Sequence, residues 1–223
     1  VIGLIIMLAR GIVDKNAATH RGVWSKSATG SREVRGKTLG IVGYGTIGTQ
    51  LSILAEALGM RVLFYDTVER PALGNAERAR SLEILLAESD VVSLHIDGRP
   101  ENKHLIGARE LKHMKRGAHL INLARGHVVD IDALAEALKS GHLGGAAVDV
   151  YPTEPRGNVT HFSTPLHNLP NVILTPHIGG STEEAQENIA RFVAGKLGAF
   201  IDTGDTALSV NLPNLVLPRL VSA

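Results

Sequence analysis

Leu39-Gly40-Ile41-Val42-Gly43-Tyr44-Gly45-Thr46-Ile47-Gly48 is the stretch that decides the fold of this 223-residue chain. Its first four residues are too few for a helix and are typical of a buried strand, and its glycines follow the pattern G-x-G-x-x-G. Apolar residues then recur at helical spacing up to Gly59, and Val62-Leu63-Phe64-Tyr65 predicts a second strand. Strand, glycine turn, helix and strand in this order predict a dinucleotide-binding unit.

Each residue of the glycine turn has an expected part in holding the dinucleotide. Gly43 allows a tight turn, Gly45 lets the backbone approach a pyrophosphate, and Gly48 lets the helix pack close to the strand. Thr46 and Ile47 begin the helix, whose unpaired N–H groups and partial positive charge suit a diphosphate. We therefore expect all five residues to line the cofactor site.

Asp66 follows the second strand, eighteen residues after Gly48, and it predicts which dinucleotide binds. Its carboxylate can accept hydrogen bonds from the ribose hydroxyls of NAD, whereas it would face the 2′-phosphate of NADP. Two unit charges about 4 Å apart repel by up to ~4 kcal/mol at an effective dielectric constant of 20, and half of that is roughly thirtyfold in affinity. The prediction is NAD, although Arg70 is near enough in sequence to offset the charge. An ordinary turn residue at a strand end is the alternative interpretation of Asp66.

The composition is that of an ordinary globular protein and excludes several function classes. With 44% hydrophobic and 20% charged residues and a formal net charge of +1, nothing indicates nucleic acid or membrane as a partner. No cysteine is present, so the chain has no disulfide or thiolate site, which is compatible with a reducing compartment. The apolar run Val1–Ala9 is too short to span a bilayer and predicts a buried helix. Because the chain begins inside that helix without Met, we expect it to be a fragment.

The remaining sequence alternates between short apolar strands and helices. Further strands are predicted at residues 90–94, 120–123, 146–150 and 172–174, and helices at 1–21, from Ser81, at 108–114, 130–138 and 181–200, the last opened by capping-box spacing at Ser181 and Glu184. This alternation predicts an α/β fold with a doubly wound parallel sheet, Rossmann-like in topology.

We expect residues 1–179 to form the dinucleotide-binding domain, and residues 180–223 a crossover helix with the remnant of a substrate domain. Loop 22–36 is polar and holds the only tryptophan, Trp24, beside Lys26. The tryptophan either marks an exposed contact surface between subunits or folds back over the edge of its own core.

Polar residues that come just after the predicted strands are the candidates for chemistry, because ligands of such sheets bind at the carboxyl ends of the strands. They are Asp66, His95, Arg125, Asp149, Glu154 and His177. Arg125 can fork onto a planar carboxylate, or form a salt bridge within the fold. His177 suits proton exchange with a hydroxyl as hydride leaves the same carbon, and Glu154 can orient its imidazole. We predict no metal site, since pairs such as His161 and His167 lack a third ligand at suitable spacing.

Four motifs, taken in order, resemble the D-isomer-specific 2-hydroxyacid dehydrogenases. They are residues 43–48, Asn122-Leu123-Ala124-Arg125-Gly126, Asp149-Val150-Tyr151-Pro152-Thr153-Glu154-Pro155 and Thr175-Pro176-His177-Ile178-Gly179-Gly180. The resemblance implies that Arg125 holds the substrate carboxylate, that His177 is the acid/base and that Glu154 is its partner. It also implies that Asp66 binds the adenosine ribose and Asp149 lies near the nicotinamide carboxamide, and we add His95, Leu123 and Gly179 to the expected cofactor contacts.

Residues 21–26 and 181–189 are most similar to family members that oxidise D-3-phosphoglycerate to 3-phosphohydroxypyruvate in serine biosynthesis. This resemblance implies a phosphorylated 2-hydroxy acid as substrate, a cytoplasmic homodimer or homotetramer, and a loop in which Trp24 reaches a neighbouring subunit with Lys26 near its phosphate pocket. The chain departs from the family in Asp97-Gly98, where proline is common two residues after His95. Because the family builds its substrate domain largely from residues that precede the cofactor domain, we expect this sequence to begin after them.

Two other functions remain open from the sequence. The first is the same chemistry on another small 2-oxo acid, such as glyoxylate, hydroxypyruvate or 2-oxoglutarate. The second is an NAD-sensing binding protein similar to the corepressors built on this fold. The complete set of Arg125, Glu154 and His177 favours an enzyme.

Overall fold

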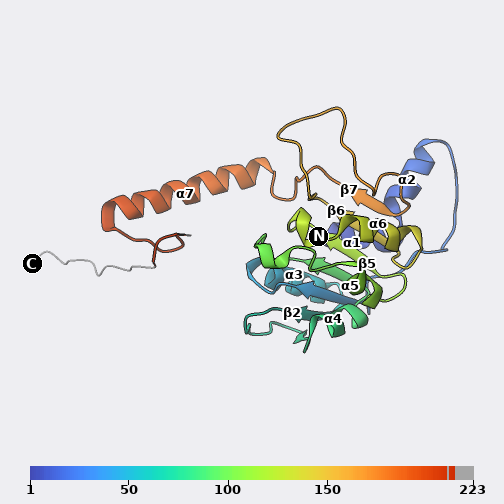
Figure 1. The fold of residues 1–223 in the computed structure, drawn as a ribbon, viewed down its shortest axis with the longest axis horizontal. Helices are drawn as coiled ribbons and strands as arrows, with labels where there is room; N and C mark the ends of the chain where they lie inside the picture. Colours follow the sequence, from blue (N-terminus) through green and yellow to red (C-terminus); the bar gives the residue numbers. More distant parts are fainter. Residues whose placement is uncertain (210, 214–223) are drawn as a thin grey trace, which may run out of the picture. The chain divides into compact units, whose positions relative to one another are not determined.

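The computed structural model describes residues 1–209 and 211–213, which form two compact units that divide after His177. The first unit is built on a seven-stranded sheet of order β3-β2-β1-β4-β5-β6-β7, in which every neighbouring pair is parallel (Figure 1). Its strands are β1 (Thr38–Val42), β2 (Arg61–Tyr65), β3 (Ala76–Arg78), β4 (Val91–Leu94), β5 (His119–Asn122), β6 (Gly145–Val148) and β7 (Val172–Leu174). The predicted doubly wound parallel fold is therefore confirmed.

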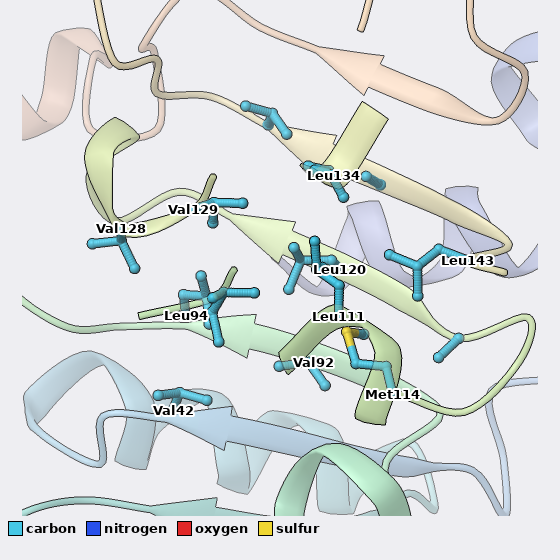
Figure 2. Close-up of a cluster of buried hydrophobic side chains, with 14 of the residues drawn as sticks. Val42, Val92, Leu94, Leu111, Met114, Leu120, Val128, Val129, Leu134 and Leu143 are labelled. Atoms are coloured by element: carbon cyan, nitrogen blue, oxygen red, sulfur yellow. The ribbon is translucent and has the colours of Figure 1, made fainter. Parts of the chain in front are cut away.

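Helices cover both faces of this sheet because its central strands are apolar on both sides. The α-helices of this unit are α1 (Ile2–Arg10), α2 (Ile12–His20), α3 (Thr46–Ala57), α4 (Leu82–Glu88), α5 (Ala108–His113) and α6 (Ile131–Lys139). Leu39 and Ile41 of β1 pack with buried residues of α1 and α3, whereas Val42 packs in a separate cluster with residues of α4, α5 and α6. Figure 2 shows residues of this second cluster, among them Val42, Val92, Leu94 and Leu120 of the strands and Leu111 of α5.

The order of the strands places the expected ligand site between β1 and β4. From β1 the chain runs through β2 to β3 on one side, and then crosses to β4 and continues to β7 on the other. Gly43 follows β1 and His95 follows β4, so both lie at the carboxyl edge of the sheet where its direction of growth reverses. Open α/β sheets bind their ligands at this point.

Two local predictions were wrong. Residues 76–78, where no strand was predicted, form β3, a three-residue edge strand paired only to β2, with only Ala76 buried. Such a short strand leaves no periodic signal. The long helix begins one residue later than the Ser181 capping box requires, because Thr182 is its N-cap and accepts a hydrogen bond from the Ala185 N–H.

The second unit begins at Ile178 and contains α7 (Glu183–Thr203), which ends at Gly204 with a φ of 70°. None of the residues of α7 is buried. The assignment of this unit as a crossover helix with part of a substrate domain stays a prediction. Among the described residues, every helix is too short or too polar to cross a membrane.

The buried imidazole of His119, at the start of β5, predicts a pH-dependent stability. Burial first, and then the Arg32 charge, lower the pKa of His119 to about 4 from the ordinary value of 6.5. Between these values the unfolded chain binds more protons, so the stability is fully present above pH 6.5 and is lost as the pH falls. We expect this group to lower the free energy of unfolding by about 2 kcal/mol between about pH 7 and 5.

Urea denaturation in phosphate-free buffers at the two pH values measures this loss. His119→Leu should remove about 2 kcal/mol of the pH-dependent difference, whereas His20→Leu, at an exposed position of α2, should leave it unchanged. An equal pH dependence in His119→Leu and the parent chain contradicts the assignment.

Candidate active site

At two positions of the glycine turn after β1, another segment of backbone lies so close that there is no space for a side chain. Gly43 has a φ of 92°, and a Cβ atom there would lie 2.5 Å from the carbonyl oxygen of His95. A Cβ atom on Gly48 would lie 2.3 Å from the carbonyl oxygen of Gly43, so only glycine lets α3 come so near to the turn. A Cβ atom on Gly45 would meet no protein atom within 4 Å, and this leaves space beside the N-terminus of α3.

Asp66 joins the end of β2 to this turn. Its two carboxylate oxygens accept hydrogen bonds from the N–H groups of Tyr44 and Val68, each at 2.8 Å. The guanidinium of Arg70 lies 3.9 Å from the same carboxylate. Asp66 thus stabilises its own turn and also lies against the glycine turn. It can therefore be a turn residue and still bind the ribose of a cofactor.

The loop after β5 holds Arg125 in a fixed backbone. The Asn122 side chain accepts a hydrogen bond from the Ala124 N–H and donates one to the Arg125 carbonyl oxygen, both at 3.1 Å. A Cβ atom on Gly126 would lie 2.0 Å from the Tyr151 carbonyl group, so this loop lies directly against the loop after β6. Gly98 also lies near this loop, although less closely, since a Cβ atom there would lie 3.1 Å from Cγ of Arg125.

The guanidinium of Arg125 is exposed and makes one hydrogen bond, to the Ala124 carbonyl oxygen at 2.6 Å. No carboxylate among the described residues forms a salt bridge with it, so the internal salt bridge considered above is wrong. Arg99, by contrast, is already paired with Asp97. Arg125 can therefore offer its remaining N–H groups to an anionic ligand.

His177 and Glu154 form a close pair at the ends of β7 and β6. Nδ1 of His177 lies 2.7 Å from Oε2 of Glu154, and Oε1 of Glu154 accepts the N–H of Tyr151 at 2.9 Å. Since a carboxylate only accepts, Nδ1 carries the proton and Nε2 is left for a ligand. Burial alone would raise the pKa of Glu154, but the hydrogen bonds from His177 and Tyr151 together lower it, so Glu154 is anionic at neutral pH.

Tyr151 fixes the loop that carries Glu154, and no pattern in the sequence selects it as a site residue. Its hydroxyl lies 3.2 Å from the Val148 carbonyl oxygen and 3.0 Å from that of Thr175, which links the ends of β6 and β7. Burial and the neighbouring Asp149 carboxylate raise the pKa of Tyr151 to about 12, so the hydroxyl stays a donor. Asp149 is itself buried, and its carboxylate accepts a hydrogen bond from the Thr175 hydroxyl.

The remaining predicted site residues are His95, Leu123, Gly179, Trp24 and Lys26. His95 follows β4, bonds to Ser93 through Nε2, and has its pKa lowered by burial to about 4. The Leu123 side chain is partly buried against the core on the α1 and α3 face, and Gly179 belongs to the second unit. Trp24 is 84% exposed, so the alternative that it folds back over its own core is wrong. Lys26 is exposed in the same loop.

A pocket of about 660 Å³ lies beside the His177–Glu154 pair. Besides these two residues, Tyr151, Phe162 and His167 line it. Its size is in the range of small-molecule sites, but Arg125 and the glycine turn do not line it. Among the described residues, no group of three or more His, Asp or Glu side chains could hold a metal ion.

The sequence of this chain is similar to those of known dehydrogenases. A family profile described as "D-isomer specific 2-hydroxyacid dehydrogenase, NAD binding domain" matches residues 2–179. The D-3-phosphoglycerate dehydrogenase of Haemophilus influenzae is 58% identical over 219 residues, covering 98% of this chain and 53% of the relative. The enzyme of that name from Escherichia coli K12 is 57% identical over 218 residues, again covering 98% and 53%. The chain thus spans about half the length of these relatives.

Solved structures show the same fold. A glyoxylate reductase from Paecilomyes thermophila superposes with a TM-score of 0.81 at 35% identity, covering 91% of this chain and 61% of that one. The D-lactate dehydrogenase of Lactobacillus jensenii, solved with NAD+, superposes with a TM-score of 0.81 at 29% identity, covering 89% and 63%.

Proposed function

Since this chain belongs to the D-isomer-specific 2-hydroxyacid dehydrogenases, matching their NAD-binding domain, we propose that it is the cofactor half of an enzyme that oxidises D-3-phosphoglycerate to 3-phosphohydroxypyruvate. The observation that carries this proposal is the 2.7 Å contact between His177 and Glu154, at the same sheet edge as Arg125. A cytoplasmic homodimer or homotetramer, with loop 22–36 reaching a neighbouring subunit, is part of the same proposal.

The residues at the sheet edge fit NAD. Gly43 and Gly48 bring the backbone close together and Gly45 leaves open space. Asp66, whose carboxylate accepts the Tyr44 N–H, would face the adenosine ribose. The N–H groups at the start of α3 would hold the pyrophosphate. When bound, NAD supplies the hydride acceptor of the reaction.

The remaining steps fall to side chains of this chain. Arg125 would hold the substrate carboxylate with two parallel hydrogen bonds and so fix the position of C2. Nε2 of His177 would take the proton of the C2 hydroxyl, because Nδ1 is already bonded to Glu154. The positive charge that forms on the imidazole would then be stabilised by the Glu154 carboxylate at 2.7 Å. In the reverse direction the same nitrogen returns the proton.

The assignment of a phosphorylated substrate rests on two supports. Relatives named D-3-phosphoglycerate dehydrogenase are 57–58% identical over almost the whole chain. Trp24 and Lys26 are exposed in the loop that we expect to reach a neighbouring subunit, and the Lys26 ammonium suits a phosphate group.

Asp66→Asn is expected to weaken the preference for NADH over NADPH by about tenfold or more. The amide keeps the size of the side chain and an acceptor for the Tyr44 N–H, but removes the charge that repels the 2′-phosphate. It also frees Arg70, now 3.9 Å from Asp66, to pair with that phosphate. Fluorescence titration of both nucleotides measures the ratio.

Two variants separate charge repulsion from other effects. Asp97→Asn removes a carboxylate that is paired with Arg99 on another loop, and it should leave the nucleotide ratio unchanged. Adding Arg70→Gln to Asp66→Asn should reverse part of the gain in NADPH affinity. A nucleotide ratio that Asp66→Asn does not change contradicts the role of Asp66.

Oxidation of NADH by this chain tests the proposed function, with 3-phosphohydroxypyruvate, 2-oxoglutarate and glyoxylate offered in parallel and NADH binding measured beside them. Fastest turnover of 3-phosphohydroxypyruvate supports the proposal, and fastest turnover of glyoxylate replaces its substrate. If NADH binds and nothing turns over, the same assay is run on a chain of the relatives' full length. No turnover there, together with NADH-dependent capture of a protein partner, would instead favour the NAD-sensing function.

A further inference from the structure

A second small pocket lies at the edge of the sheet opposite to the glycine turn. Lys37, Asp90 and His119 line it, at the starts of β1, β4 and β5, together with residues 32–34 and 115–118. Its volume is about 40 Å³, whereas one water molecule needs about 10–15 Å³. The pocket therefore has room for a group of a few atoms and is too small for a nucleotide.

The lining of this pocket carries more positive than negative charge. Its cations are Arg32, Lys37, Lys115 and Arg116, and its carboxylates are Glu33 and Asp90. Both carboxylates already have cationic partners: Asp90 lies 3.3 Å from Nζ of Lys115, and Glu33 lies 3.9 Å from Arg10. In the part of the chain that the structure describes, no ion-pair partner is found for Arg32, Lys37 or Arg116.

Asp90 is further occupied within the fold. Its second carboxylate oxygen accepts the N–H of Thr38 at 2.8 Å, at the first residue of β1. This hydrogen bond and the Lys115 contact use both of its oxygens. The Asp90 carboxylate therefore does not neutralise the surplus of positive charge in the pocket.

His119 brings an imidazole to the wall of the pocket. The residue is 7% exposed, and among the described residues no hydrogen bond to its ring nitrogens is found. Since no buried side-chain nitrogen or oxygen of the described residues lacks a partner, a ring nitrogen without one is accessible to a bound molecule. A neutral imidazole offers one N–H donor, and the pocket around it also offers guanidinium and ammonium donors.

We propose that this pocket binds a phosphate-type oxyanion, as inorganic phosphate or as the phosphate group of a small phosphorylated molecule, held by Arg32, Arg116 and His119. A tetrahedral oxyanion presents acceptors in several directions, as three donors from two separate segments require, and guanidinium groups match its geometry. This site is independent of the proposed function, since it lies at the other edge of the sheet from His177 and Asp66.

Titration of the chain with inorganic phosphate tests the site, at constant ionic strength and with saturating NADH so that the glycine turn is blocked. Binding is followed by calorimetry and by the NMR signals of the His119 ring. We expect saturable binding that shifts the His119 signals. The double variant Arg32→Gln/Arg116→Gln should weaken binding by about tenfold or more. Both residues are exposed, so this variant should fold normally, which thermal unfolding verifies.

Lys112→Gln is the matched control, because Lys112 is an exposed cation on α5 that does not line the pocket, and it should change the affinity by less than about twofold. Titration with glycerol phosphate distinguishes the two forms of the ligand. If glycerol phosphate and inorganic phosphate both bind, the pocket accepts the phosphate group of a phosphorylated molecule. If only inorganic phosphate binds, the ligand is the free anion. Absence of binding under saturating NADH, or equal affinity in the double variant, overturns the proposal.

Discussion

His177→Asn is expected to lower turnover by about 10²–10⁴-fold while changing the affinity for NADH by less than about threefold. Asparagine can still donate a hydrogen bond to Glu154, so the loop after β7 should keep its conformation. It cannot take up a proton near neutral pH, so the C2 hydroxyl loses its base. Steady-state rates and NADH titration of the chain that shows turnover measure the two quantities.

The expected loss of turnover depends on how the backbone and the Glu154 contact hold the His177 ring. Its backbone adopts a φ of 56°, which is uncommon for residues other than glycine, and its ring is held by a hydrogen bond to a carboxylate twenty-three residues away in sequence. His113→Asn is the matched control, since His113 is an exposed residue of α5, and it should leave turnover unchanged. If His177→Asn keeps its rate, another group moves the proton.

Much of the fold was predictable because each central strand is a short, fully buried apolar run. β1 and β4 are buried at every position. Their sequences are therefore short runs of mostly apolar residues, which differ clearly from the 3.6-residue periodicity of the neighbouring helices. β3 has one buried residue in three and pairs on one side only, so it leaves no such signal. At the start of α7, Ser181 and Thr182 are both capping hydroxyls, and the choice between them depends on where the preceding loop ends.

The sequence could predict those candidate site residues that follow strands. It could not predict the contacts that join one loop to another. Arg125, Glu154 and His177 each follow a strand, so the topology brings them to one edge. The pairing of Asp66 with the Tyr44 N–H joins residues of two loops, and no local pattern shows it. Asn122 was missed because it ends a buried strand, although a polar residue in the run Leu-Ile-Asn-Leu is itself a signal.

Replacing Arg125 with glutamine is expected to raise the KM for the 2-oxo acid by about a hundredfold or more, with little change in NADH affinity. The loss of a two-pronged, charge-assisted contact to a carboxylate costs about 3 kcal/mol or more. Arg125→Lys keeps the charge but loses the fork, so it should recover only part of this loss. Substrate titration at saturating NADH measures the KM of each variant.

Arg99 provides the matched control for Arg125, because it is an arginine in the neighbouring loop whose guanidinium is already bonded to Asp97. Arg99→Gln should leave the KM for the 2-oxo acid within about twofold of the parent value. The two arginines differ in the groups to which their guanidinium groups bond. Arg99 is paired with the Asp97 carboxylate, whereas Arg125 bonds to a carbonyl oxygen and has no carboxylate partner among the described residues. An arginine at a strand end without an acidic partner is poised for an anionic ligand, and equal KM values for Arg125→Gln and the parent would show that this ligand is not the substrate carboxylate.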